Sequence, residues 1–356
     1  MKNRRLIAQP LLGSIGLVVT VGFALLVCVA FDARTFATWV AFLIMSIVPA
    51  QTIMDLVWKN SYPPALMRLP QPFKGIVILA SLAVVGCVIV PLTLKLVGGS
   101  VTPPIPFLNI YMILSILATF WLVAVFQCWP FSAISAKPTV IGVGTMVLAY
   151  LLAWWIFNAG FDFGVMEKAP FYLASLDPHG AFPVWSIFSY LVTTVAVIMA
   201  LVLFDFWSFT GPSEKSTQLT RQPLFGLLVG LFVLIASALI WTAGVHWVGM
   251  DRVDFMVRIP ISFLLGNFIL LLLFQTAPFH KMAQPVKGIL LNVFSAVLAV
   301  LAYSMYRYVA LAVVGDLPAG PPTYTLDLWV AAAMLSVTLP VIVAYAGALE
   351  CWPFSS

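Results

Sequence analysis

Polar side chains recur at one place in this sequence: the end of a long apolar run, close to a tryptophan, phenylalanine or proline. The residues that we interpret as equivalent are Asp55, Gln127, Asp205, Gln275 and Glu350, with Asp55 as a degenerate copy. A carboxylate at a helix C-terminus faces the negative end of the helix dipole, so it needs a cation, a basic partner or water. We interpret these groups either as hydrated among lipid headgroups or as one level of an ion or solute pathway, in which Asp55, Asp205 or Glu350 titrates.

Two amide side chains, Gln51 and Asn267, lie deeper within apolar runs. Polar residues inside a membrane span are uncommon and often mark a pathway for an ion or a solute. Gln51 precedes Asp55 by one helical turn, and the nearby Pro49 frees backbone carbonyls that would otherwise be bonded within the helix. We therefore expect Gln51 and Asn267 to contact a solute.

Three basic residues, Lys95, Arg258 and Arg307, fall near the opposite ends of their apolar runs. Long basic side chains there can extend to the membrane interface. Asp254 and Arg258 have the i,i+4 spacing of a helical ion pair. The alternative is an outer basic vestibule that attracts an anionic solute.

Cofactor chemistry finds little support in the sequence. The three histidines lie in loops or at the ends of apolar runs, which disfavours a membrane haem protein. The chain lacks a phosphate-binding loop. Cys128 and Cys351 occupy the same position beside tryptophan, which raises a Cu(I) path, but the 13 methionines show no clustering along one helix. We predict no cofactor and no metal site.

One acid–imidazole pair is close in sequence, Asp177 and His179, and it raises the hypothesis of an intramembrane enzyme that acts on lipid. The setting, Asp177-Pro178-His179-Gly180, is first of all typical of a turn. The sequence therefore favours a protein that is not an enzyme, without deciding the question.

Composition determines which elements position these residues. Of the 356 residues, 63% are hydrophobic and 8% are charged, against about 25% charged in soluble domains. Long apolar runs of this kind predict an all-α polytopic membrane protein, because each run can cross about 30 Å of hydrocarbon. We predict about ten transmembrane helices: 11–31, 37–58, 73–97, 107–128, 139–159, 184–206, 223–246, 256–276, 286–311 and 327–350.

A two-helix pattern recurs along the chain. Odd-numbered runs begin with Gln-Pro-x-x-Gly, and even-numbered runs end with the polar–aromatic motif described above. The Gln-Pro-x-x-Gly copies begin at Gln9, Gln71, Gln222 and Gln284, with a looser copy at Lys137. Proline suits the first helical turn, and glycine lets another helix approach closely. We predict a single transmembrane domain over 1–356, built as five two-helix repeats: approximately 9–58, 71–131, 137–209, 222–279 and 284–354.

The distribution of basic residues predicts the orientation. Eleven of the seventeen lie on the side of the N-terminus: Lys2, Arg4, Arg5, Lys59, Arg68, Lys74, Lys137, Lys215, Arg221, Lys281 and Lys287. We expect both termini in the cytoplasm and a location in the plasma (inner) membrane.

These observations favour a permease, a secondary transporter of a small solute that is proton- or cation-coupled. The alternative is a non-catalytic membrane subunit that docks a redox or biosynthetic partner and binds quinone or lipid between its helices. The expected partners are membrane lipid, a small solute, and either partner subunits or further copies of the chain. Nothing in the sequence favours nucleic acid.

Overall fold

The structure is a computed structural model, and it describes residues 7–210, 221–277 and 279–354. Ten helical spans in this part of the chain are long and apolar enough to cross a membrane. The predicted all-α polytopic membrane fold is therefore confirmed. The basic residues Lys2, Arg4, Arg5 and Lys215, which enter the charge count, lie outside the described residues.

The first five spans are composed as follows. They consist of α1 (Leu11–Val29); α2 (Ala33–Thr35), η1 (Phe36–Val40), α3 (Ala41–Thr52) and η2 (Ile53–Val57); α4 (Phe73–Leu96); α5 (Pro106–Phe120) and η4 (Trp121–Val125); and α7 (Pro138–Gly160). Short elements near them are η3 (Pro64–Arg68), α6 (Phe131–Ile134), β1 (Phe161–Asp162), η5 (Gly164–Met166), η6 (Ala174–Leu176) and β2 (Phe182–Pro183). The two strands form one short parallel pair.

The second five spans contain more π-helical turns. They consist of α8 (Val184–Leu203); α10 (Leu224–Thr242) and η7 (Ala243–Trp247); α11 (Arg252–Met256), η8 (Val257–Ile261), α12 (Ser262–Phe268) and η9 (Ile269–Leu273); α13 (Val286–Val309) and η10 (Ala310–Val314); and α14 (Thr325–Ala331), η11 (Ala332–Thr338), α15 (Leu339–Val343) and η12 (Ala344–Ala348). The short helix α9 (Trp207–Thr210) follows α8.

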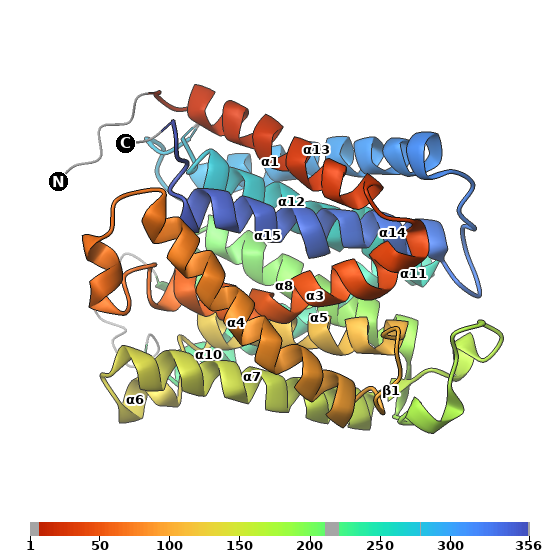
Figure 1. Ribbon diagram of the computed structural model, residues 1–356. Coiled ribbons are helices and arrows are strands. Elements are labelled where there is room, and N and C mark those ends of the chain that lie inside the picture. The colour runs from red at the N-terminus through yellow and green to blue at the C-terminus, as the bar shows by residue number, and fades with distance from the viewer. Residues whose placement is uncertain (1–6, 211–220, 278, 355–356) are drawn as a thin grey trace.

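The spans form two layers. In the even-numbered spans, which we call the inner spans, 61–72% of the most apolar window is buried, against 22–33% in the odd-numbered, outer spans. The outer spans expose large apolar side chains such as Val84, Leu231 and Val300. Apolar residues on all sides are what a helix between protein and lipid requires. Figure 1 shows the spans running side by side along the length of the bundle.

The inner spans contact one another in chain order and close into a ring. α3 packs against α5, α5 against α8, and α8 against α11 and α12; α12 and η9 pack against α15, and α15 returns to α3. Each outer span packs against the inner span that precedes it in the chain: α4 on α3, α7 on α5, α10 on α8 and α13 on α12. The first span, α1, packs on α15 and η11, so every inner span has one outer span against it.

The Gln-Pro-x-x-Gly motif connects the layers at the end of the bundle where α1 begins, which we call the proximal end. Gln71 illustrates its action: the Oε1 atom accepts from Gly75 N at 3.3 Å, and Nε2 donates to Ala348 O at 3.0 Å. Gln9, Gln222 and Gln284 make the same two bonds, one from the glycine of their own motif and one to a backbone carbonyl of another span. A methyl group at Gly75 would lie 3.0 Å from Ala348 O, which confirms that glycine permits this close approach.

Candidate functional site

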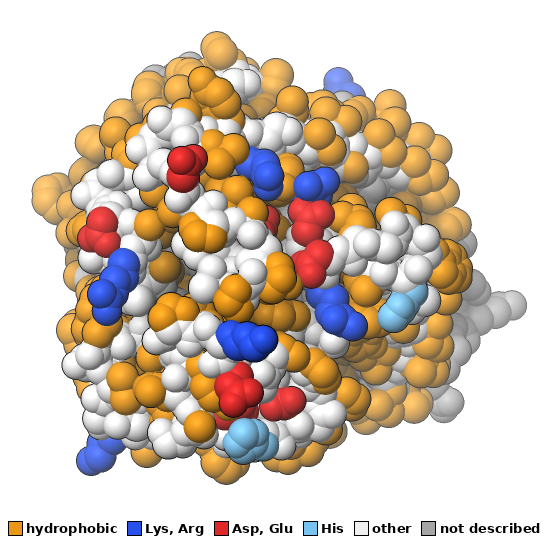
Figure 2. Space-filling model, turned by 90° about the vertical axis from the view of Figure 1, so that its right-hand side faces the viewer, with side chains coloured by type: hydrophobic (Ala, Val, Ile, Leu, Met, Phe, Trp, Pro, Cys, Tyr) orange, Lys and Arg blue, Asp and Glu red, His pale blue; other side chains and the backbone are white. Residues whose placement is uncertain are grey.

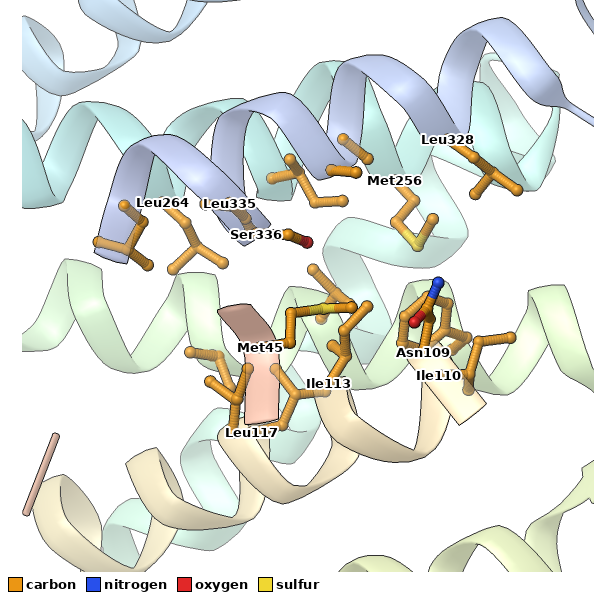
Figure 3. A pocket seen from close by; sticks show the side chains of 18 of the residues that line it. Met45, Asn109, Ile110, Ile113, Leu117, Met256, Leu264, Leu328, Leu335 and Ser336 are labelled. Atoms are coloured by element: carbon orange, nitrogen blue, oxygen red, sulfur yellow. The ribbon is translucent and has the colours of Figure 1, made fainter. Parts of the chain in front are cut away.

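The ring of inner spans encloses a chamber of about 150 Å³ on its axis. All five inner spans line it; Figure 3 shows Met45, Ile113, Leu264 and Leu335 converging from four of them, and Val192 lies on the fifth. Almost the whole lining is apolar. The chamber lies toward the end of the bundle opposite the proximal end, which we call the distal end.

Apart from the indole of Trp185, two polar side chains line the chamber. Asn109 Nδ2 donates to Ala37 O at 2.6 Å, and Asn109 Oδ1 has no hydrogen-bond partner among the described residues. Ser336 lies on η11 opposite α5, and its hydroxyl points into the chamber in Figure 3. Its residue is 4% exposed, and no hydrogen bond to its hydroxyl occurs in the described part of the chain.

A second cavity of about 30 Å³ lies on the same axis toward the proximal end. Gln51, Thr52 and Asp55 line it together with apolar residues of three other inner spans. A cavity of this size with polar walls holds one or two waters. It is thus smaller and more polar than the chamber.

Four residues, which we call the constriction, border both cavities: Val48, Phe120, Phe268 and Leu339. The rings of Phe120 and Phe268 lie 5.6 Å apart, centroid to centroid, at an interplanar angle of 57°. Both residues are less than 10% exposed. The chamber and the polar cavity are therefore separated by a thin apolar layer with an aromatic pair at its centre.

Asp55 is held from two sides. Asn60 Nδ2 donates to Asp55 Oδ1 at 2.8 Å, from the loop that follows the same span. On the other side, a methyl group on Gly347 would lie 2.5 Å from Asp55 Oδ1, so the backbone of η12 fits closely against the carboxylate. Gln51 Nε2 donates to Pro340 O at 3.0 Å. Gln51 Oε1 is buried and has no partner among the described residues.

The other residues at the proximal ends lie outside both cavities. Gln127, Asp205 and Gln275 are exposed, and Asp205 pairs with Lys287 at 3.0 Å. Glu350 is partly buried and pairs with Lys74 at 2.5 Å. The structure describes all seven residues of the predicted pathway, and only Gln51 and Asp55 among the seven line an axial cavity.

The structure also shows which residues at the proximal ends are equivalent. Each inner span ends in two consecutive residues with positive φ: Lys59–Asn60, Gln127–Cys128, Asp205–Phe206, Gln275–Thr276 and Glu350–Cys351. Asp55 lies four residues before its pair, so it is about one turn deeper than the other four. The equivalence expected between Asp55 and the other four residues does not hold in this geometry.

Asn267 lies away from the axis. Its Oδ1 accepts from Ser295 Oγ at 2.9 Å, which places the side chain between α12 and the outer span α13. Asn267 Nδ2 is buried and has no partner among the described residues. The predicted contact between Asn267 and a solute therefore has no cavity to support it in this structure.

The three distal basic residues do not form one cluster. Arg258 pairs with Asp254 at 2.7 Å, and Arg307 lies 3.8 Å from Asp327. Both arginines also donate to Tyr303 Oη. Lys95 is exposed on α4, which packs on α3 and not on the spans that carry Arg258 and Arg307. Figure 2 shows acidic side chains beside the basic ones across the distal end, so this surface carries both signs of charge.

The Asp177–His179 pair belongs to a well-bonded distal loop. The buried Asp177 carboxylate accepts from Phe163 N at 3.1 Å, His179 N at 2.9 Å and Tyr172 Oη at 2.9 Å. The hydrogen bond to Asp177 raises the pKa of Tyr172 to about 12. Three bonds use most of the acceptor capacity of the carboxylate, so its evident role is to hold the turn.

A third cavity of about 270 Å³ lies in the outer layer, between α4 and α7 over η2. Trp58, Tyr62 and Ser81 contribute its polar groups, and the remaining lining is apolar. Trp58 Nε1 is engaged with Pro138 O at 2.7 Å. This cavity lies outside the ring of inner spans.

Comparisons of the chain with known protein families, with curated proteins and with solved structures find no match.

Sequence reasoning missed the constriction and the chamber. A usable signal exists in the spacing from the positive-φ pairs. Phe120 and Phe268 each lie seven residues before the first residue of their pair, and Thr52 and Val343 occupy the same position in their spans. All four line the second cavity. The polar–aromatic motif thus shows which residue of each inner span faces the axis, because that residue lies about two turns before the motif.

Proposed function

We propose that this protein is a permease that moves a small solute across a membrane, coupled to a proton or another cation. We further propose that the chain consists of five two-helix units around a central path. The observation that carries the proposal is the pair of cavities on one axis: all five inner spans line the chamber, four of them line the polar cavity, and the constriction lies between the two. Binding sites between the helices of a bundle are a common location for small ligands.

The proposed coupling residue is Asp55. Among the described residues that line the two axial cavities, it alone carries an ionisable side chain. An ionisable group inside a membrane protein is by default a candidate for ion binding or proton transfer. Gln51, one turn away on the same wall, supplies the adjacent amide.

The proposed repeats are supported by contacts that recur around the bundle. Four Gln-Pro-x-x-Gly glutamines make the same two hydrogen bonds, and five inner spans end in the same pair of positive-φ residues. Five similar units that each contribute one inner and one outer span account for a ring with one wall per unit.

Transport is tested with the purified protein in liposomes. Stopped-flow light scattering measures the entry of uncharged solutes, such as propionamide and 1,2-butanediol, with and without an imposed pH gradient. We expect faster entry than in protein-free liposomes, and we expect Asp55→Asn to abolish the effect of the gradient. Asp205→Asn is the matched control, because Asp205 is exposed and outside both cavities.

Two results would count against the proposal. Entry rates equal to those of protein-free liposomes, for every solute and gradient, would refute the proposed permease function. A gradient effect that survives Asp55→Asn would leave transport intact and remove the coupling role of Asp55.

The proposed location is the plasma (inner) membrane with both termini in the cytoplasm, which rests on the excess of basic residues at the proximal end. Reporter fusions after Ser356 and in the distal loop near His179 test the orientation. A cytoplasmic distal loop would reverse it.

The second candidate is a membrane subunit that binds lipid or quinone and docks a partner. The third cavity favours it, because an apolar groove with Trp58 and Tyr62 at one end suits an amphiphile. Purification in mild detergent distinguishes the candidates: a stoichiometric partner chain supports the subunit, and a homogeneous single chain or homo-oligomer supports the permease.

A further inference from the structure

The size of the chamber and the composition of its walls limit what it can hold. An apolar cavity of about 150 Å³ engineered into another protein stays dry and binds benzene or xenon. The chamber here has the same volume and a similar lining of Leu, Ile, Phe, Met and Val side chains. Its natural content is therefore a compact molecule about the size of a benzene ring, and not a column of water.

Charge is excluded from the chamber by the same walls. No lysine, arginine, histidine, aspartate or glutamate lies among its lining residues, all of which the structure describes. An ion buried without a partner pays a large desolvation penalty, which keeps it out of such a site. Arg258 and Arg307 at the distal end pair with Asp254 and Asp327, and no arginine lines the chamber.

Besides the indole of Trp185, two side chains bring polar groups to the chamber lining. The Ser336 hydroxyl points into the space and makes no hydrogen bond within the described part of the chain. Asn109 is anchored to Ala37 O, so its amide is fixed in orientation at the distal part of the chamber. A hydroxyl can donate or accept, so Ser336 can bond a polar group of either kind.

We propose that the chamber is a binding site for a small uncharged molecule with an apolar body, whose single polar end hydrogen-bonds to Ser336. This inference rests on the proposed permease function, because it names the class of solute that the path accepts. The one ionisable group of the proposed path, Asp55, lies on the proximal side of the constriction, and the solute itself crosses the chamber uncharged.

Binding is tested directly, in lipid nanodiscs, by ¹⁹F NMR with four fluorinated probes. Fluorobenzene and 4-fluorophenol are uncharged at pH 7, whereas 4-fluorobenzoate and 4-fluorobenzylammonium carry one charge each on a ring of the same size. Nanodiscs without protein correct for partition into lipid. We expect saturable shifts for the two uncharged probes only.

Three variants locate the binding. Ala332→Phe puts a phenyl ring into the chamber and should abolish saturable binding of both uncharged probes. Ala296→Phe is the matched control, because Ala296 is exposed on the outer span α13, and it should bind both probes like the unmodified protein. Ser336→Ala should weaken 4-fluorophenol roughly two- to tenfold, the effect of one hydrogen bond, and leave fluorobenzene unchanged.

Each result has a defined consequence. Equal binding of 4-fluorobenzoate and 4-fluorophenol, or binding that survives Ala332→Phe in a folded protein, overturns the inference. An unchanged affinity of Ser336→Ala for 4-fluorophenol overturns the role of Ser336. This substitution removes a single oxygen atom, so we expect the variant to fold. Saturable binding without transport in liposomes would leave the chamber assigned and remove the permease; transport without such binding would do the reverse.

Discussion

Removal of one ring of the constriction should increase the flux of solute. Phe268→Ala opens the layer between the chamber and the polar cavity, where Phe120 and Phe268 form the aromatic pair. A solute that passes must first separate the two rings. Such a pair is worth about 0.5–1.5 kcal/mol beyond the area that it buries. If this pair limits the passage, its loss lowers the barrier by the same amount, which corresponds to roughly a two- to twelvefold faster flux.

The assay is the stopped-flow entry of propionamide into liposomes at equal protein density. Phe294→Ala is the matched control, because Phe294 forms a comparable ring pair with Phe279 at 6.2 Å on an outer span. The stability loss of Phe268→Ala should lie below the 3–5 kcal/mol of a fully packed phenylalanine, since the ring already borders two cavities. A folded Phe268→Ala protein whose flux equals that of Phe294→Ala would refute the assignment of the constriction.

Three further predictions concern other contacts. Gly347→Val should displace the Asp55 carboxylate, because the added atoms would overlap with its Oδ1, and so should reproduce the loss of gradient dependence expected for Asp55→Asn in the liposome assay. Gln71→Leu removes two hydrogen bonds, one to Ala348 O of another span and one that caps its own helix at Gly75 N. It should therefore lower the free energy of unfolding in detergent by roughly 1–3 kcal/mol. Asp177→Asn removes the anionic acceptor that raises the pKa of Tyr172 to about 12, so ultraviolet difference titration against a Tyr172→Phe protein should show that tyrosine ionising at lower pH. In the unmodified protein the stabilisation linked to Tyr172 is present below its unfolded pKa and is lost as pH rises toward 12.

The ten spans could be predicted from sequence because hydrocarbon imposes one strong rule, a run of apolar residues about 20 long. The role of the Gln-Pro-x-x-Gly glycines could also be predicted, since close helix approach requires a small residue there. The layer to which each span belongs could not. The hydropathies of the inner and outer spans overlap, whereas their burial does not, and single residues such as Val300 and Val192 differ only in burial.

The polar residues of the candidate site could be predicted from the sequence, whereas its apolar residues could not. Gln51 and Asp55, which line the polar cavity, could be named as candidates because a polar side chain within an apolar run is uncommon. Phe120 and Phe268 are ordinary residues for a membrane span, and their role depends on which face meets the axis. Asn267 is also polar and deep, but its partner Ser295 is on an outer span, so its predicted contact with a solute stays a prediction without a cavity beside it.

The recurrence of a motif and the location of chemistry follow different logic in a bundle of this kind. A glutamine or an acidic residue that occurs in several units meets the same kind of neighbour each time, as Gln71 meets Ala348 O and Glu350 meets Lys74. Such positions assemble the ring. A solute on the axis contacts all five walls at once, so one polar group on one wall is enough to orient it. Among the lining residues, the polar cavity has a carboxylate only at Asp55 and the chamber has a hydroxyl only at Ser336. The proposed chemistry therefore lies where the five units differ.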